Sequence, residues 1–204
     1  MIVNNLSYQV NGKNIIDDVS FVLSNKNKVG LVGVNGSGKT TLLKILSSKL
    51  KDYTGNVNNE SETIAYLKQE IEPKYNDLSI FEYVKQETGL KNLEEKLKIL
   101  ENNLTEENME EYGELLNNYL LLDGYSVENN LKEILNGLDF KKDLYTKISI
   151  LSGGEKIKIL LSVVLLKNAD ILLLDEPTNN LDLEAILWLE QKLKNSNKKM
   201  LIIS

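Results

Sequence analysis

The 204-residue sequence contains no cysteine, no histidine and no arginine, so all 24 of its basic residues are lysine. Without cysteine the chain has no disulfide and no thiolate chemistry, which fits a reducing compartment. Without histidine or arginine, these residues cannot supply a catalytic imidazole, a zinc site built on His or Cys, or an arginine finger in cis. Any chemistry must come from lysines, carboxylates, hydroxyls, amides and the backbone.

Long apolar runs and positive charge are also scarce. The longest apolar run, Ile159 to Leu166, is interrupted by Ser162 and is far shorter than the roughly 20 residues that cross a bilayer. The first residues, MIVNNLSYQV, lack the basic and then apolar order of a signal peptide. The formal net charge of −6 argues against nonspecific binding to nucleic acid. We therefore expect no membrane span, no direct DNA binding and a cytoplasmic location.

Short apolar runs predict buried strands of a mostly parallel sheet. Hydrophobic residues make up 42% of the chain, as in ordinary globular proteins, and continuous runs suit strands covered on both faces. The runs are Val29 to Val32, Ile171 to Leu174 and Met200 to Ile203. Helical patterns alternate with these runs, which predicts an α/β fold. The helices are expected at Thr40 to Ser48, Ser152 to Leu166 and Leu183 to Leu193.

The N-terminal segment predicts an antiparallel part of the fold. Ile2 to Val10 and Val19 to Leu23 have the composition of strands. Asn11-Gly12 lies between them and is a strong signal for a hairpin turn. We therefore expect antiparallel strands before the parallel sheet begins.

Residues 78–124 predict a helical, arm-like insertion. Leucines recur at alternating spacings of three and four, as in a coiled-coil seam, and predict one helix. These leucines are Leu90, Leu93, Leu97, Leu100 and Leu104. Thr105 is a good N-cap for a second helix, with Glu106 and Glu107 in its first turn and Gly124 at its end. The two helices would form a hairpin.

A further helix is predicted before the hairpin. Ser79 and Glu82 have the spacing of a capping box, in which each side chain binds the other residue's backbone N–H. Gly89 is expected to end that helix.

The sharpest motif follows the first buried run. Residues 33–40, GVNGSGKT, match the pattern G-x-x-x-x-G-K-[ST] between a strand and an amphipathic helix. Its glycines let backbone N–H groups point at a phosphate, and the helix N-terminus adds partial positive charge. Lys39 is expected to reach the β- and γ-phosphates, and Thr40 to offer its hydroxyl to Mg²⁺. The plainer alternative is a glycine-rich turn that binds nothing.

Two acids follow the second buried run. Asp175 could hold Mg²⁺ through water, and Glu176 could polarise the water that attacks the γ-phosphate. Alone, such a pair is no more than the start of a solvated loop. Ligands of open α/β sheets bind at the carboxyl ends of strands, however, and both these acids and the glycine loop are expected there.

A second helix start also suggests an anion site. Ser152, Gly153, Gly154 and Glu155 precede or open a predicted helix and offer free N–H groups and a hydroxyl. An ordinary helix cap needs only the serine. Because the chain has one phosphate loop, two anion-binding helix starts suggest that a nucleotide is sandwiched between two copies of the domain.

The order of these motifs resembles that of ATP-binding cassette (ABC) ATPases over essentially the whole chain. The resemblance implies a P-loop NTPase fold that binds ATP with Mg²⁺ and hydrolyses ATP to ADP and phosphate. It implies that Gln69 contacts Mg²⁺ and the attacking water, that Tyr8 stacks on adenine, and that Leu181 and Asp182 form the D-loop. The implied ATP-binding residues are Tyr8, Gly33, Val34, Asn35, Gly36, Ser37, Gly38, Lys39, Thr40 and Thr41. The implied catalytic residues are Glu176, Gln69 and Lys39, the metal-binding residues are Thr40, Gln69 and Asp175, and the signature that acts in trans is Ser152, Gly153, Gly154 and Glu155.

Within that family the chain is most similar to the ABC-F group, which lacks membrane domains and acts on the ribosome. Gln69 lies only 30 positions after Lys39, whereas Ser152 lies 83 positions after Gln69, and the hairpin accounts for the excess. ABC-F proteins carry at this place an arm that touches the ribosome or bound tRNA. The strings YLKQE, LSGGEK and LLLDEPTNNLD are also close to the group's patterns. The resemblance implies a translation factor or a ribosome-protecting antibiotic-resistance protein, with a second cassette in the same chain or in a homodimer.

The chain departs from the ABC-F pattern in three ways. Asn180 stands where the group usually has histidine, and Lys158 lies where a basic residue, often arginine, is usual. Residues 90–123 contain three lysines against nine acids, a poor surface for rRNA phosphate, so ribosomal protein is the alternative contact. The sequence stops at Ser204, before the expected switch histidine, which predicts a cassette incomplete at its C-terminus (residues 1–204) with impaired hydrolysis.

Two other functions remain open at this point. The same chemistry could belong to an ATP-binding subunit of a membrane transporter, which a shorter segment between Gln69 and Ser152 would favour. The chain could also be a regulatory nucleotide-binding remnant.

Overall fold

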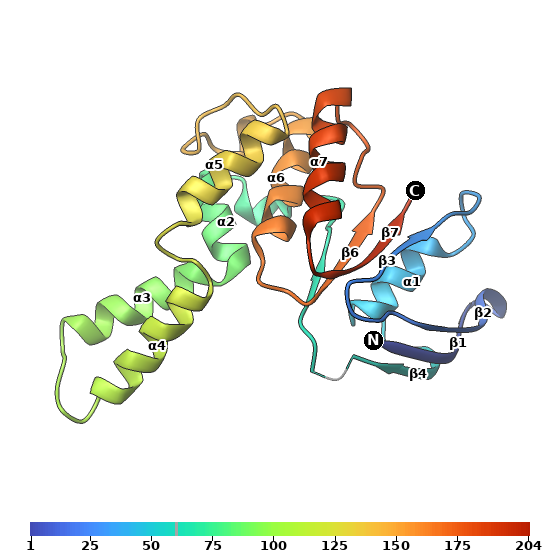
Figure 1. The fold of residues 1–204 in the computed structure, drawn as a ribbon, viewed down its shortest axis with the longest axis horizontal. Helices are drawn as coiled ribbons and strands as arrows, with labels where there is room; N and C mark the ends of the chain where they lie inside the picture. Colours follow the sequence, from blue (N-terminus) through green and yellow to red (C-terminus); the bar gives the residue numbers. More distant parts are fainter. Residues whose placement is uncertain (60) are drawn as a thin grey trace. The chain divides into compact units, whose positions relative to one another are not determined.

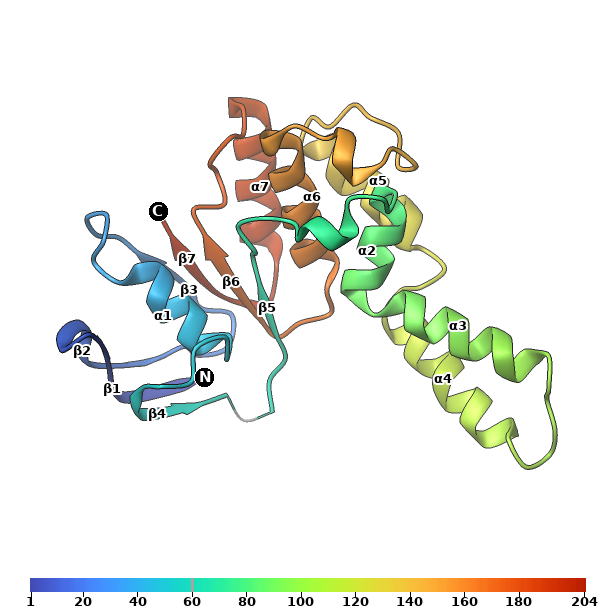
Figure 2. The same cartoon turned by 180° about the vertical axis from the view of Figure 1, so that it is seen from behind.

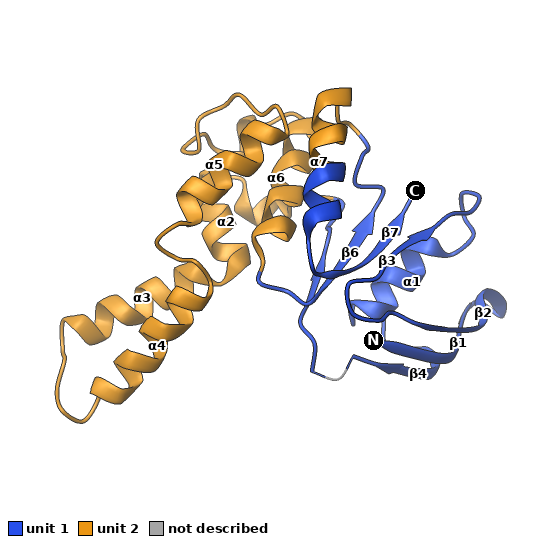
Figure 3. Ribbon diagram, in the orientation of Figure 1, with its two compact units in different colours: residues 1–69, 168–179, 190–204 blue, residues 70–167, 180–189 orange. Residues whose placement is uncertain are grey.

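The structure is a computed structural model that describes residues 1–59 and 61–204 (Figure 1). The chain forms two compact units (Figure 3). Unit 1 consists of residues 1–69, 168–179 and 190–204, and unit 2 of residues 70–167 and 180–189. Every strand of the described chain lies in unit 1, whereas the regular elements of unit 2 are helices.

The first sheet of unit 1 is antiparallel, with the strand order β2-β1-β4. Its strands are β1 (Ile2–Val10), β2 (Lys13–Val22) and β4 (Thr54–Asn58). Asn11 and Gly12 both have positive φ, 49° and 78°, as a type I′ hairpin turn requires, and the predicted hairpin is confirmed. The strand expected from Val19 begins at Lys13 instead, because the tight turn pairs Val10 directly with Lys13 and so draws polar residues into the ladder.

The second sheet is parallel, with the order β3-β7-β6-β5, and Figure 2 shows β7, β6 and β5 side by side. Its strands are β3 (Lys28–Leu31), β5 (Ile64–Tyr66), β6 (Ile171–Asp175) and β7 (Lys199–Ile203). The three predicted strands are thus confirmed to within one residue at each end. The expected burial is wrong for β3, whose residues are exposed or half-buried because the strand lies at the edge of the sheet. Because the strands are parallel, the carboxyl ends of β3 and β6 meet at one edge of the sheet.

Helix α1 (Lys39–Leu46) follows β3 and closes the core of unit 1. The buried Leu43 of α1 shares one apolar cluster with Leu6 of β1 and Leu173 of β6. Burial of each such side chain contributes roughly 1.5–3 kcal/mol. The cluster therefore holds the antiparallel sheet, α1 and the parallel sheet together as one unit.

Unit 2 consists of helices and of the short segments between them. They are the 3₁₀ turns η1 (Pro73–Tyr75) and η2 (Ile148–Ile150), and the α-helices α2 (Ile80–Thr88), α3 (Leu90–Glu101), α4 (Met109–Leu121), α5 (Val127–Gly137) and α6 (Gly153–Leu166). Helix α7 (Leu183–Asn195) is divided between the units after Leu189. The helical hairpin is confirmed as α3 and α4, while the single-cassette description of residues 1–204 with an insertion stays a prediction.

Several predicted helix ends are confirmed. Ser79 and Glu82 make the capping box of α2: the Ser79 hydroxyl accepts from the Glu82 backbone N–H, and Glu82 accepts from the Ser79 N–H at 2.9 Å. Gly89 ends α2 in the left-handed conformation with a φ of 85°, which a glycine adopts at little cost.

Two predictions about the hairpin are wrong in detail. The leucine seam ends with α3 at Glu101, so Leu104 lies in the loop and is 46% exposed. Thr105 does not cap α4, because its backbone N–H donates to the side chain of Asn108 at 2.8 Å and Asn108 itself takes the cap position. Local side-chain bonds within the loop therefore delay the helix by three residues.

Helix α5 was absent from the sequence prediction, although it buries four apolar side chains. Its Val127 joins Leu90, Leu97 and Tyr119 in a small core at the base of the hairpin. Gly124 lies against the Tyr119 ring, so closely that a side chain there would overlap it. Burial, and then the nearby Glu94 carboxylate, raise the pKa of Tyr119 to about 12.

In the part of the chain that the structure describes, no helix is long and apolar enough to cross a membrane.

Candidate functional site

The loop between β3 and α1 takes the shape that a phosphate loop needs. Gly36 and Gly38 have φ of 82° and 90°, and Gly38 is the residue that precedes the first turn of α1. A Cβ at Gly38 would lie 2.7 Å from the Ile15 carbonyl oxygen, whereas one at Gly36 would meet no atom within 4 Å. Gly38 is therefore needed for both its backbone conformation and its close packing on β2, and Gly36 for its conformation.

Lys39 is held by the loop that it follows. Its ammonium donates to the carbonyl oxygens of Gly33 at 2.6 Å and Val34 at 3.2 Å. These bonds keep the lysine at the mouth of the loop, where it satisfies two carbonyls. To contact a phosphate the ammonium would exchange these acceptors for phosphate oxygens, which are charged and therefore stronger acceptors.

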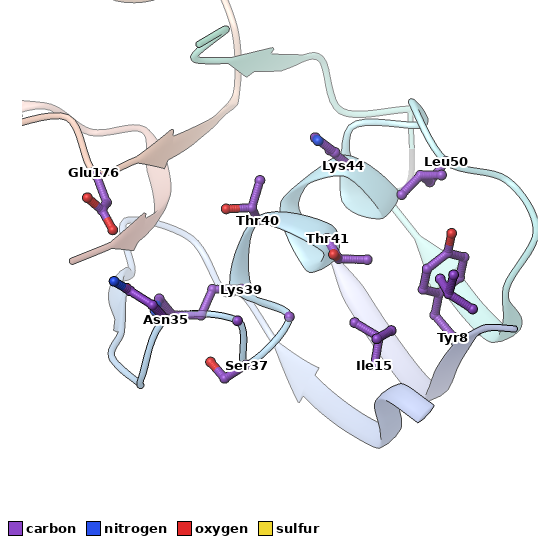
Figure 4. A pocket seen from close by; sticks show the side chains of 13 residues that line it. Tyr8, Ile15, Asn35, Ser37, Lys39, Thr40, Thr41, Lys44, Leu50 and Glu176 are labelled. Atoms are coloured by element: carbon purple, nitrogen blue, oxygen red, sulfur yellow. The ribbon is translucent and has the colours of Figure 1, made fainter. Parts of the chain in front are cut away.

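The loop opens into a cavity of about 620 Å³, a size typical of cofactor sites (Figure 4). The lining residues all belong to unit 1, and they are Tyr8, Val10, Ile15, Asn35, Gly36, Ser37, Gly38, Lys39, Thr40, Thr41, Lys44, Leu50 and Glu176. Figure 4 shows Tyr8, Ile15 and Leu50 gathered beyond one side of α1, with Asn35 and Glu176 toward the other. The cavity thus has an apolar end that suits an aromatic base and a polar end that suits phosphates.

Most predicted ATP-binding residues line this cavity, but two do not. Gly33 and Val34 are outside the lining, although the carbonyl oxygens of both accept from the Lys39 ammonium. The sequence prediction missed Val10, Ile15, Lys44 and Leu50. Their apolar or amphipathic types fit an ordinary strand, helix or loop, so no pattern along the chain could single them out.

Gln69 and Asp175 are brought together by the pairing of β5 with β6. The Gln69 amide donates to Asp175 Oδ2 at 3.2 Å, although 106 positions separate the two residues. The Tyr66 side chain lies nearby, and burial, followed by the charge of Asp175, raises its pKa. Asp175 ends β6 and Gln69 follows β5, so the parallel register sets their approach.

The available donors fit Mg²⁺ that is bound together with a phosphate. Among the described residues, no group of three or more histidine, cysteine or acidic side chains could hold a metal ion by itself. Thr40, Gln69 and Asp175 offer a hydroxyl, an amide and a carboxylate, all oxygen ligands of the kind that Mg²⁺ takes. Mg²⁺ commonly keeps several waters and phosphate oxygens, so a small protein ligand set of this type suffices.

Glu176 follows Asp175 in an unusual backbone conformation. Its φ is 46°, in the left-handed region that non-glycine residues seldom adopt. Its N–H donates to the Ile203 carbonyl of β7 at 3.0 Å, and its carboxylate accepts from the Asn179 amide at 2.5 Å. Glu176, which is half-buried as a residue, is thereby held at the cavity wall.

The predicted signature residues lie in unit 2, at the start of α6, and do not line the cavity of unit 1. Ser152 and Glu155 form a second capping box, with the Ser152 N–H donating to Glu155 at 2.8 Å. The Lys142 ammonium also donates to Glu155 at 2.8 Å, and this bond, followed by that of the Ser152 N–H, lowers the pKa of Glu155. A Cβ at Gly153 would meet no atom within 4 Å, so packing within the chain does not require glycine there.

The predicted D-loop residues precede α7 in unit 2. Asp182 accepts from the Ala185 N–H at 2.9 Å and so caps α7, and this bond lowers the pKa of Asp182. The Lys158 ammonium of α6 lies 3.5 Å from Asp182 Oδ2 and donates to the Asp139 carbonyl oxygen at 3.2 Å. Leu181 is half-buried.

Comparison with known proteins identifies the family. The profile of the family described as "ABC transporter" matches residues 16–179. The chain is 35% identical over 209 residues to the ABC transporter ATP-binding protein YkpA of Bacillus subtilis, covering 99% of this chain and 38% of that protein. It is 34% identical over 219 residues to "ABC transporter F family member 2" of Arabidopsis thaliana, covering 99% and 32%. The chain therefore spans about a third of the length of these relatives.

Solved structures agree on the fold. A putative ABC transporter ATP-binding protein from Pyrococcus furiosus superposes with a TM-score of 0.68 at 25% identity, over 100% of this chain and 90% of that one. An archaeal ribosome recycling factor, aABCE1, solved in complex with the ribosomal stalk protein aP1, superposes with the same TM-score at 22% identity, over 100% and 33%. The α/β fold is that of the P-loop NTPases of the ABC ATPase type, and the chain belongs to the ABC transporter family.

Proposed function

We propose that the chain binds ATP with Mg²⁺ in the cavity of unit 1 and hydrolyses it to ADP and phosphate. One observation carries this proposal: Glu176 lines the same cavity as Lys39 and the loop of residues 35–38. A base and a phosphate-binding lysine on one cavity wall are what phosphoryl transfer to water needs. Membership of an ATPase family supports the same reaction.

The two ends of the cavity would bind different parts of ATP. The backbone N–H groups of the loop and the Lys39 ammonium would hold the phosphates, with the N-terminus of α1 adding partial positive charge. Tyr8 would stack on the base, beside Ile15 and Leu50. Thr41 would contact the nucleotide next to Thr40.

Hydrolysis would use Glu176 as the general base. The Glu176 carboxylate takes a proton from water as the water oxygen attacks the γ-phosphorus, and the bond to the bridging oxygen breaks to release ADP. Gln69 would orient that water, and Lys39 would stabilise negative charge on the phosphates. Mg²⁺, held by Thr40, Gln69 and Asp175, would supply further charge neutralisation there.

The signature residues are proposed to act on nucleotide held by a second cassette. Ser152 caps the N-terminus of α6, and the space at Gly153 leaves room for the backbone to approach a phosphate. The hydrogen bond between Lys142 and Glu155 would hold the backbone at the start of this helix in place. Gly154 lies beside Asn180 there. The second cassette would come from the same protein or from a second copy.

The hydrolysis proposal is tested with two variants of the protein at the length its gene encodes. Glu176→Gln removes the base but keeps the shape of the side chain, so phosphate release is expected to fall at least about 100-fold while ATP binding persists. Lys39→Met removes the ammonium and is expected to weaken ATP binding by roughly tenfold or more in calorimetry.

Matched controls lie in unit 1 but outside the cavity. Glu190→Gln on α7 and Lys51→Met after α1 make the same chemical changes at exposed positions, and both should leave ATP binding and turnover unaltered. Undiminished turnover in Glu176→Gln would contradict the assignment of the base. Undiminished binding in Lys39→Met would contradict the assignment of the phosphate loop.

We also propose that the complete protein acts on the ribosome, in translation or in protection from antibiotics, in the cytoplasm. The ABC-F relatives and the likeness to a ribosome recycling factor support this proposal. The hairpin of α3 and α4 would be the contact, and its excess of acids favours basic ribosomal proteins over rRNA.

Co-sedimentation with ribosomes tests the proposal, using Glu176→Gln with ATP to hold the nucleotide-bound state. Pelleting that depends on ATP, and that is lost when residues 90–123 are replaced by a short linker, is the expected result. Cross-links from the hairpin only to rRNA would contradict its assigned partner. Recovery with membranes instead of ribosomes would favour a transporter subunit, as the name of YkpA also allows.

A further inference from the structure

Glu176 begins a tight turn whose backbone is fixed from both sides. The sequence Glu-Pro-Thr-Asn (residues 176–179) forms a turn in which the Asn179 N–H donates to the Glu176 carbonyl at 3.1 Å. Pro177 at the second position presets its own φ near the value that such turns use. Before the turn, the Glu176 N–H donates to the carbonyl oxygen of Ile203 at 3.0 Å. These bonds hold Glu176 at its φ of 46°, a strained conformation that persists only where its surroundings enforce it.

The same asparagine also holds the carboxylate. The Asn179 side-chain amide donates to Glu176 Oε2 at 2.5 Å, next to the backbone bond from the same residue. Asn179 thus restrains Glu176 at two points, through its main chain and through its side chain. We propose that Asn179 is a positioning residue that orients the Glu176 carboxylate for proton abstraction.

The chemistry favours such a restraint. A glutamate has three rotatable bonds, and an unrestrained carboxylate at a cavity wall would sample several orientations. An ionised carboxylate accepts through both of its oxygens, so the amide can occupy Oε2 while Oε1 remains able to accept a proton from water. The amide carries no charge and no exchangeable acid of its own near neutral pH, so it orients the base without competing for the proton. This inference rests on the proposed role of Glu176 as the base.

Asn179→Ala isolates the side-chain contribution, because every residue except proline keeps the backbone N–H that closes the turn. We expect kcat for ATP hydrolysis to fall roughly tenfold, equivalent to about 1.4 kcal/mol of transition-state free energy, while the KM for ATP changes less than about twofold. Thr178→Ala is the matched control, since Thr178 is an exposed residue of the same turn. It should leave kcat and KM unaltered.

The Glu176→Gln variant separates failure of this inference from failure of the proposed function. In that background, adding Asn179→Ala should cause no further loss, because the group that Asn179 orients is gone. Full kcat in Asn179→Ala beside an inactive Glu176→Gln would overturn the inference and leave the base in place. Equal loss in Asn179→Ala and Thr178→Ala would reduce Asn179 to a turn residue. Full turnover in Glu176→Gln itself would overturn both proposals.

Discussion

Replacing Gly38 by alanine is expected to destabilise unit 1 more than the same change at Gly36. Both glycines have positive φ, 90° and 82°, so alanine at either position incurs the left-handed cost of roughly 1–2 kcal/mol. Only at Gly38 would the new Cβ also meet backbone, 2.7 Å from the carbonyl oxygen of Ile15. Relief of that overlap requires β2 or the loop to shift, at a cost of typically about 1–3 kcal/mol. The difference between the two variants should therefore be about 1–3 kcal/mol.

The assay is urea denaturation without nucleotide, followed by circular dichroism, with the free energy of unfolding compared at equal slope. Gly36→Ala is the matched control, since the two variants share the same chemistry and the same backbone cost. We also expect Gly38→Ala to weaken ATP binding more, because the residue precedes the first turn of α1. Equal destabilisation by the two variants would refute the reasoning that contact with Ile15 is what requires glycine at position 38.

Two further predictions concern unit 2, where the single tryptophan, Trp188, serves as a fluorescent reporter. The Lys142 ammonium lowers the pKa of Glu155 from its ordinary value of 4.5, so this ion pair stabilises the fold above about pH 4.5 and the stabilisation is lost as the pH falls below that value. Lys142→Met should therefore reduce the free energy of unfolding in urea near neutral pH but not near pH 3. An equal loss at both pH values would contradict the role of the ion pair. Gly137 packs so closely on the Trp188 ring that Gly137→Ala should destabilise by about 1–3 kcal/mol. Gly113→Ala, in open space within α4, should instead stabilise by about 0.5–1 kcal/mol, and the same sign for both would contradict the packing argument.

Local sequence signals predicted the elements that they encode directly. The turn at Asn11 and Gly12, the capping box at Ser79 and the buried run of β6 each depend on residues close in the chain, and all are confirmed. The predicted cap of α4 was wrong because a different local hydrogen bond formed. The Thr105 N–H donates to the Asn108 side chain, and Asn108 takes the cap position expected of Thr105.

Contacts between distant residues account for the parts of the site that were missed. Val10, Ile15 and Leu50 carry no chemical motif, and they form the apolar end of the cavity only because the hairpin folds beside α1. The bond of Gln69 to Asp175 needs the register of β5 against β6, which no spacing along the chain specifies.

The sequence by itself determined the α/β fold class, the glycine-rich loop of residues 33–40 and the acids after β6, because each depends on the local preferences of consecutive residues. The tertiary structure alone decided which residues share the cavity of unit 1. It also decided that Glu176 adopts a left-handed backbone conformation, that its N–H donates to the Ile203 carbonyl and that its carboxylate is restrained by Asn179. The reason is physical: short-range patterns set backbone preference and burial, whereas the orientation of a side chain depends on the neighbours that packing brings to it.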